Sequence, residues 1–366
     1  MNISDRVEAL DLSGIRKVFD LAQKLENPIN FSIGQPDFDV PTNILKSAEE
    51  AMRSGLNSYT PTQGRSDLLT EVQNDAKNRG LQFEDTIITS GVSGGLLLSF
   101  SALLNPGDEV VLADPYFLMY KQLCTYLGAV PKYVSTYPSL KLTAETLEPH
   151  LSEKTKLVLF NSPGNPTGVG LTIDEMKDLC SLLKKYPNIT VISDEIYRLF
   201  HYEDTFTSLS SLLENVITLD GFSKSHSLTG WRVGWANGPK HILQQMAKLQ
   251  QFTFVCAPSF AQKACVEAIH TDMSEFRNAY KKKSELLYEL LSPKFELEAS
   301  SGTFYSFPKV PEKYSSADEF VEAALDKNVM VIPGSVFSEQ NTHFRISFAC
   351  SDDKIQEGCE LLLQLV

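Results

Sequence analysis

The sequence predicts an α/β protein: a large domain with a mostly parallel central sheet flanked by helices, and a smaller α+β domain. Two observations lead to this prediction. Short apolar segments alternate with helical patterns between residues 85 and 236, as in parallel sheets with crossover helices. A chain of 366 residues also exceeds what one hydrophobic core usually organises. We expect the large domain to span residues 40–255 and the small domain to combine 1–39 with 256–366.

Six apolar runs are expected to form the buried strands of the large domain. They are residues 86–89, 109–113, 155–160, 189–193, 215–219 and 231–236. Between them, the stretch 171–186 has the periodicity of an amphipathic helix. Ligands of such sheets bind beyond the carboxyl ends of the strands, so polar residues that follow these runs are the first candidates for a site.

The pattern changes after Lys240 to long helical stretches. Three further apolar runs, at 303–308, 329–333 and 344–349, alternate with these helices. This order of elements predicts the smaller α+β domain, which the first 39 residues are expected to join.

Composition and charge exclude several classes of function. The formal net charge of -13 opposes binding to nucleic acids or anionic membranes, and we expect neither partner. The six cysteines form no CxxC pair and no Cys/His spacing suited to zinc, so no metal site is expected. The first twenty residues are too polar for a signal peptide, and no apolar run is long enough to span a bilayer. We therefore expect a cytoplasmic protein.

Lys224 is the first candidate catalytic residue. It lies in GFSKSHSLTGWRVGW, just after the apolar run 215–219. A lone lysine at a strand end is usually a solvated surface residue. A lysine in desolvating or cationic surroundings can instead form a Schiff base with an aldehyde, and Ser223 with Arg232 can hold a phosphate dianion. An aldehyde combined with a phosphate points to pyridoxal 5'-phosphate (PLP).

Asp194 and Tyr197 follow the next candidate strand, in TVISDEIY. Asp194 taken alone is most simply a helix or turn cap. A carboxylate at a strand end can also keep the pyridine nitrogen of PLP protonated, which lets the ring accept electrons. Tyr197 can donate to the phenolate oxygen of the cofactor, whereas Glu195 should point elsewhere.

Asn165 lies in the segment NSPGNPTG, which follows the run 155–160. This segment has the composition of a Pro/Gly turn. The turn is compatible with a second hydrogen bond, from Asn165 to the same phenolate oxygen.

A glycine-rich turn and a group of aromatic residues complete the candidates. TSGVSGGL leads from a strand into a helix, where the backbone N–H groups of Val92 and Ser93 can hold phosphate. DPYFLMY offers Tyr116, Phe117 and Tyr120, which are most simply core residues; one of them can stack on the pyridine ring.

Together these motifs resemble the class I/II aminotransferases of PLP fold type I, over almost the whole chain. SGIRKVFDLAQKLENPINFSIGQPDFDVP and SYTPTQG are similar to the N-terminal signature of the broad aspartate and aromatic aminotransferase subgroup. NSPGNPTG, DEIY, SKSHSLTGWRVGW and HFRISFA follow in the family's order.

The resemblance implies a role for each site residue. Lys224 would form the internal aldimine with PLP, Asp194 would pair with the pyridine nitrogen, and Asn165 and Tyr197 would contact the phenolate oxygen. The phosphate would be held by Val92, Ser93, Ser223, Arg232 and, from the partner subunit of a homodimer, Tyr59. Arg345 would bind the substrate α-carboxylate as a bidentate fork, beside the backbone of Gly34.

Two departures from the family pattern bear on substrate and cofactor contacts. Phe117 stands where relatives often have tryptophan, so stacking on the ring is kept while an indole N–H contact is lost. No arginine could be matched to the one that some dicarboxylate-specific relatives supply from the partner subunit.

The sequence therefore predicts ping-pong transfer of an amino group from an aromatic amino acid, methionine, aspartate or alanine to a 2-oxo acid such as 2-oxoglutarate. Two alternatives stay open at this point. A PLP-dependent carbon–sulfur β-lyase has nearly the same motifs, because fold does not fix which bond is broken. A non-catalytic PLP-fold binding module is the more remote alternative.

Overall fold

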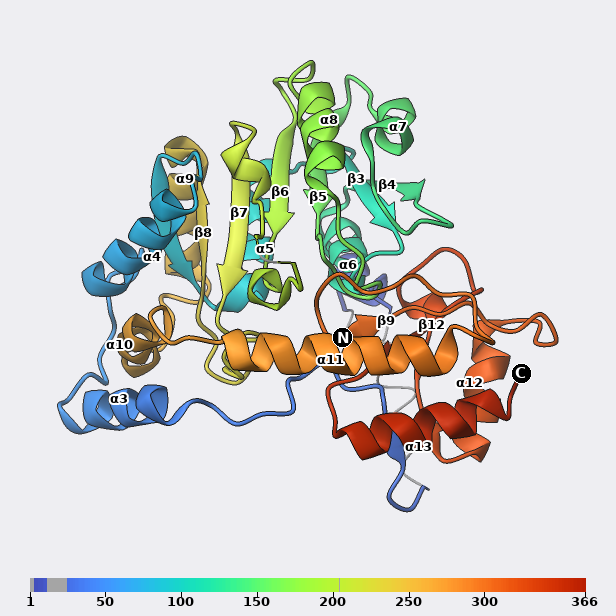
Figure 1. Cartoon of the computed structure of the whole chain (residues 1–366). Helices are drawn as coiled ribbons and strands as arrows, with labels where there is room; N and C mark the ends of the chain where they lie inside the picture. The colour runs from blue at the N-terminus through green and yellow to red at the C-terminus, as the bar shows by residue number, and fades with distance from the viewer. Residues whose placement is uncertain (1–2, 12–24, 204) are drawn as a thin grey trace.

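A seven-stranded sheet forms the centre of the larger part of the molecule (Figure 1). The computed structural model describes residues 3–11, 25–203 and 205–366, so residues 13–24 of the N-terminal motif lie outside the described part. The strand order is β2-β8-β7-β6-β5-β3-β4. All neighbouring pairs are parallel except those of β8, which is antiparallel to both neighbours. The predicted mostly parallel α/β sheet is confirmed. The strands are β2 (Asp85–Thr89), β3 (Glu109–Asp114), β4 (Val130–Ser135), β5 (Thr155–Phe160), β6 (Thr190–Asp194), β7 (Val216–Gly221) and β8 (Gly234–Gly238).

Two strands differ from the sequence prediction. β4 was not predicted, because its sequence VPKYVS contains Pro131 and is mostly half-exposed. It is an edge strand of the sheet, which is where proline is tolerated. β8 begins at Gly234 rather than at Trp231, since Arg232 has a left-handed backbone (φ 56°) that ends extended structure before the strand.

The sheet is covered on both faces, which explains the continuous apolar runs of its central strands. Along β5, Leu157 and Leu159 pack into one core with α5 (Gly91–Leu103), α6 (Leu118–Leu127) and α9 (Lys240–Phe252). Val158 and Phe160 face the opposite core, which α8 (Ile173–Leu183) covers. Because both faces of the sheet are packed, the carboxyl ends of β5, β6 and β7 are held in place at one edge of the sheet.

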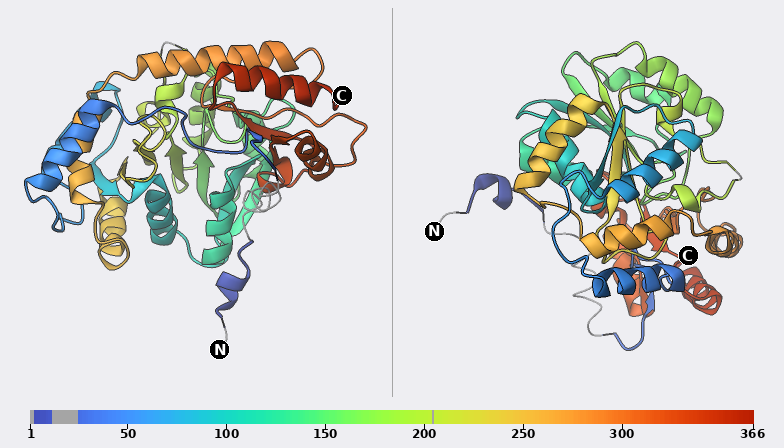
Figure 2. Two further views of the ribbon diagram at one scale, coloured as in Figure 1. Left: turned by 90° about the horizontal axis from the view of Figure 1, so that it is seen from below. Right: turned by 90° about the vertical axis from the view of Figure 1, so that its left-hand side faces the viewer.

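The smaller part of the molecule combines both ends of the chain. β1 (Ile29–Asn30) pairs in parallel with β10 (Val329–Met330), and β11 (Ile332–Pro333), β12 (Phe344–Ser347) and β9 (Tyr305–Ser306) form an antiparallel sheet. The helix α11 (Ser274–Leu291) passes below the strand ends of the large sheet and packs against α13 (Asp352–Leu363) (Figures 1 and 2). The domain boundaries at residues 40 and 255 stay a prediction.

The remaining helices lie around these two sheets. α10 (Ser259–Ala268) packs on α3 (Thr42–Arg53) and α4 (Ser66–Asn78), and α12 (Ala317–Asp326) contacts β10 and β11. Short helices are α1 (Asp5–Glu8) and α7 (Ala144–Leu147). In the part of the chain that the structure describes, no helix is long and apolar enough to cross a membrane.

A largely buried ionic network joins α4 to β7 and to the residues that follow β6. Arg198 donates to Asp220 and, over 3.2 Å, to Asp75. Arg79 donates to the same Asp75 over 3.0 Å and to Glu195 over 3.4 Å. Glu195 therefore points away from Asp194 and into this network. This agrees with the expectation from the sequence that Glu195 points elsewhere.

Replacing Asp220 with alanine should destabilise the fold by about 3–5 kcal/mol, because it leaves the guanidinium of Arg198 buried with only one of its two carboxylate partners. Urea unfolding measures the effect. The control is Asp174→Ala, which removes an exposed pair with Lys177 and should cost less than about 0.5 kcal/mol. Equal costs for the two variants would contradict a stabilising network.

Candidate active site

A cavity of about 370 Å³ lies where the ends of β5, β6 and β7 face the small sheet. Eleven of the twelve predicted site residues line it; they come from both parts of the molecule, from Gly34 near the start of the chain to Arg345 near its end. These are Gly34, Val92, Ser93, Phe117, Asn165, Asp194, Tyr197, Ser223, Lys224, Arg232 and Arg345. The cavity thus lies at the strand ends, which is where the sequence pattern predicted a site.

Asp194 ends β6 on the floor of the cavity and is 4% exposed. Its Oδ2 accepts a hydrogen bond of 2.8 Å from the Tyr120 hydroxyl, and its Oδ1 accepts one of 3.3 Å from the backbone N–H of Ile196. No lysine or arginine of the described residues forms a salt bridge with it. Burial raises the pKa of Asp194 to about 7, more than these hydrogen bonds lower it. The carboxylate is therefore poised to accept a cationic partner.

Lys224 follows β7 and reaches across to the N-terminal segment. Its Nζ donates to the backbone oxygen of Gly34 over 2.6 Å. Burial, reinforced by the positive charges of Arg345 and Arg232, lowers the pKa of Lys224 to about 8. Roughly a tenth of the amine is therefore uncharged and nucleophilic at pH 7, far more than for an ordinary lysine.

One end of the cavity is suited to an anion. Gly91 starts α5 with a left-handed backbone (φ 66°), and the first turn of this 13-residue helix contains Val92 and Ser93. The guanidinium of Arg232 lies against Gly91, where an added Cβ would be 2.6 Å from Nη2. Its Nη1 donates to the backbone oxygen of Thr229 over 3.0 Å. Free N–H groups of a helix start beside an arginine form a site for phosphate.

Arg345 also lines the cavity, from β12, and is 2% exposed. Its Nη1 donates to Asn165 Oδ1 over 3.0 Å, and its Nη2 donates to the backbone oxygen of Ser32 over 2.7 Å. Nε is buried and has no partner among the described residues. The two arginines of the cavity thus contact different segments: Arg232 lies against the start of α5, whereas Arg345 is bound to Asn165 and Ser32.

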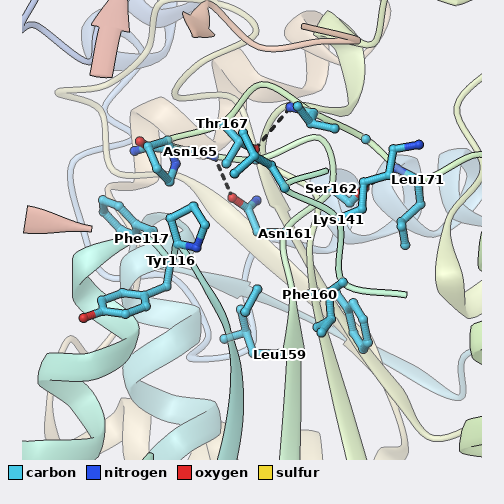
Figure 3. A pocket seen from close by; sticks show the side chains of 18 of the residues that line it. Tyr116, Phe117, Lys141, Leu159, Phe160, Asn161, Ser162, Asn165, Thr167 and Leu171 are labelled. Atoms are coloured by element: carbon cyan, nitrogen blue, oxygen red, sulfur yellow. Dashed lines mark hydrogen bonds between the residues drawn. The ribbon is translucent and has the colours of Figure 1, made fainter. Parts of the chain in front are cut away.

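Asn161 and Asn165 form the wall between this cavity and a smaller one of about 50 Å³, shown in Figure 3. Asn161 Oδ1 accepts from the backbone N–H of Asn165 over 3.0 Å, and its Nδ2 donates to the backbone oxygen of Asp194 over 2.8 Å. Figure 3 shows Phe117 beside Asn165 on this wall. The turn after β5 is thereby tied to the end of β6, and this fixes the backbone N–H of Asn165.

Tyr59 is the one predicted residue outside the cavity. It lies on the loop before α4 and is 84% exposed. This exposure is compatible with the expected contact to a partner subunit, which stays a prediction.

Several polar residues of the cavity were not predicted from the sequence, among them Tyr120, Asn161 and Tyr305. Tyr120 was considered only as core or as a stacking ring, and its bond to Asp194 was not foreseen. Asn161 follows the same strand as the predicted Asn165, so the same sequence pattern could have indicated it. Tyr305 lies in a two-residue strand and gave no signal.

The whole chain was compared with known proteins. The family model "Aminotransferase class I and II" matches residues 26–362. The chain belongs to this family. A probable N-acetyl-LL-diaminopimelate aminotransferase of Bacillus subtilis is 36% identical over 372 residues, which cover 98% of this chain and 94% of the relative. Aromatic-amino-acid aminotransferase 2 of Thermococcus litoralis is 32% identical, with 98% and 97% covered.

Solved structures of aminotransferases have the same fold. The aspartate aminotransferase of Thermus thermophilus with maleate superposes with a TM-score of 0.95 at 28% identity, over 100% of both chains. The aspartate aminotransferase of Thermotoga maritima gives a TM-score of 0.92 at 31% identity, over 99% of both. The chain is thus an aminotransferase of class I/II, and the names of its relatives differ in substrate.

Membership of the class I/II aminotransferases implies PLP, and the cavity of this aminotransferase fits that cofactor. The buried carboxylate of Asp194 lacks a cation and matches a protonated pyridine nitrogen. The desolvated amine of Lys224 matches an aldehyde. The close approach of Arg232 to Gly91 leaves no room for a side chain there and matches a phosphate cradle.

Proposed function

We propose that this aminotransferase binds PLP through Lys224 and transfers an amino group from an α-amino acid to a 2-oxo acid such as 2-oxoglutarate. The observation that carries the proposal is the composition of one cavity: a lysine with a lowered pKa, a buried carboxylate without a cationic partner among the described residues, and two arginines that contact different segments. When bound, PLP supplies an aldehyde that condenses with amines and a ring that accepts electrons from the substrate Cα.

Lys224 and Asp194 are proposed to carry the chemistry. The amine of Lys224 would hold the cofactor and, once the amino donor has displaced it, would take the proton from the substrate Cα and return it to the former aldehyde carbon, on the other side of the substrate nitrogen. Its pKa of about 8 keeps both protonation states available at neutral pH. Asp194 holds the proton on the pyridine nitrogen, because a negative charge in this buried site strongly favours a cation beside it.

The other lining residues are proposed to orient the cofactor. Asn165 and Tyr197 hold the phenolate oxygen, and Phe117 stacks on the ring. The phosphate is held by Arg232 and by the start of α5 with Val92, Ser93 and Ser223.

Arg345 is proposed to bind the α-carboxylate of both substrates, with the backbone of Gly34 at close quarters. The guanidinium is already flanked by Asn165 and by the backbone of Ser32, which set its orientation before a substrate arrives. Beyond these groups, Ile33 and Leu96 give the cavity apolar lining. This lining supports aromatic amino acids or methionine as donors, with aspartate and alanine as rivals.

A homodimer is proposed as the active assembly, with Tyr59 contacting the phosphate of the partner's site. Support comes from exposed apolar residues in two segments: Tyr59 lies on the loop before α4, and Phe252, Phe254 and Val255 lie at and just after the end of α9. Gln250 of α9 donates to the backbone oxygen of Thr62 in the loop that carries Tyr59. Sedimentation of a fully active monomer would contradict this assembly.

The test is a spectroscopic titration of the PLP-loaded protein. Single amino acids are added without any oxo acid, and the visible band of the cofactor should be lost with a few donors and restored by 2-oxoglutarate. Release of pyruvate and ammonia from cystathionine without an acceptor would instead identify a β-lyase.

A further inference from the structure

Arg345 contacts two aromatic rings. The centre of its guanidinium lies 4.7 Å from the ring centroid of Tyr305 and 4.7 Å from that of Phe337. Both rings are buried, at 1% and 0% exposure. A desolvated guanidinium over an aromatic ring is a favourable contact, and two such contacts restrict the orientation of the guanidinium.

The position of Tyr305 follows from the small sheet. β9 pairs with β12 so that Tyr305 is opposite Ser347, and Arg345 is two residues from Ser347 on the same face of that strand. The turn before Tyr305 is unusual, because Thr303 has a left-handed backbone (φ 69°) that a β-branched residue rarely adopts. The Thr303 side chain accepts from the backbone N–H of Tyr305 over 3.0 Å, which directs the ring toward Arg345.

Tyr305 also contacts two other residues of the site. Its hydroxyl accepts a long hydrogen bond of 3.5 Å from the Tyr197 hydroxyl. An added Cβ on Gly34 would lie 2.6 Å from the same hydroxyl oxygen, so the backbone of Gly34 passes directly beside it. The ring is therefore confined on its edges as well as on the face that Arg345 covers.

We propose that Tyr305 is a positioning residue for substrate carboxylate binding: its ring, together with that of Phe337, holds the guanidinium of Arg345 in the orientation that meets the α-carboxylate. The inference rests on the proposed role of Arg345. It assigns the effect to the ring of Tyr305, so phenylalanine should replace it and leucine should not.

The test compares Tyr305→Leu, Tyr305→Phe and Arg345→Gln in the PLP-loaded protein. Calorimetry measures the dissociation constant of 3-phenylpropanoate, a carboxylate without an amino group that can be transferred. Tyr305→Leu should weaken binding roughly tenfold, the scale of one desolvated cation–π contact, and Tyr305→Phe should stay within about twofold of wild type. In steady-state assays, Tyr305→Leu should raise KM for both substrates with a smaller change in kcat.

A control separates positioning from general loss of packing. Phe320→Leu removes another fully buried ring of the small domain, one that packs on Phe344 rather than on Arg345, and should leave the dissociation constant unchanged. Unchanged binding in Tyr305→Leu, while Arg345→Gln binds poorly, overturns the inference alone. Unchanged binding in Arg345→Gln overturns the proposed carboxylate site and the inference with it.

Discussion

Replacing Lys224 with alanine should lower the transamination rate by roughly four orders of magnitude or more and leave the fold intact. The loss is large because the variant lacks both the amine that holds the cofactor and the base that moves the Cα proton, and general base catalysis alone contributes about 10²–10⁴. Single-turnover measurement with an amino donor, in the presence of added PLP, gives the rate. Near-wild-type turnover in the purified variant would refute the assignment.

The stability of this variant is expected to equal or exceed that of wild type at pH 7. Lys224 has a folded-state pKa of about 8, below its usual 10.5, so the folded state disfavours the charged amine. Between pH 8 and 10.5 the unfolded chain binds more protons than the folded one, and the stability of the cofactor-free protein rises with pH there. Alanine removes this unfavourable burial. The matched control, Lys240→Ala at the exposed start of α9, should change neither activity nor stability.

The central sheet could be predicted where burial dictates composition. β5 and β6 are covered on both faces, so both have apolar residues at consecutive positions, 157–160 in β5 and 191–192 in β6. The edge strand β4 is covered less and contains Pro131, and its sequence therefore carries no such signal. The direction of β8 could not be predicted either, because the two-residue period of a strand is the same for parallel and antiparallel pairing.

The residues of the site likewise divide into those that the sequence pattern could indicate and those that it could not. Asp194 and Lys224 could be found because carboxyl ends of neighbouring strands meet at one edge of a sheet. Arg345 lies inside β12, where an arginine has no distinguishing pattern, and only the resemblance to aminotransferases pointed to it. Tyr305 could not be predicted, because its position beside Arg345 depends on pairing between strands about 40 residues apart in the sequence.

Replacing Asp194 with asparagine should change activity and stability in opposite directions. Activity should fall because the neutral amide no longer holds a proton on the pyridine nitrogen. Loss of one electrostatic contribution of this kind costs about 2.7–4 kcal/mol, or 10²–10³ in kcat. The side chain keeps its size and can still accept from the Tyr120 hydroxyl, so a loss of packing does not explain the effect. Unchanged kcat with PLP bound would refute the proposed role.

Stability of the cofactor-free protein should rise in the same variant, and the rise should depend on pH. The folded-state pKa of Asp194 is about 7, above its usual 3.8, so between these values the folded state binds a proton that the unfolded chain has lost. Wild-type stability therefore falls as pH rises from 3.8 to 7, by up to about 4 kcal/mol at 1.36 kcal/mol per pKa unit. Asparagine is uncharged, so the stability of the Asp194→Asn variant should not fall in this way over the same pH range.

Urea unfolding of the cofactor-free proteins at pH 5 and pH 8 checks the sign. At pH 5 the carboxyl of Asp194 is protonated in the folded wild type, so the advantage of asparagine should be smaller than at pH 8, where the wild type must bury the charge. The exposed Asp174→Asn variant should show no such pH dependence. An equal or lower stability of Asp194→Asn at pH 8 would mean that the buried carboxylate already has a favourable partner without the cofactor, and the argument for a pyridinium beside it would lose its physical basis.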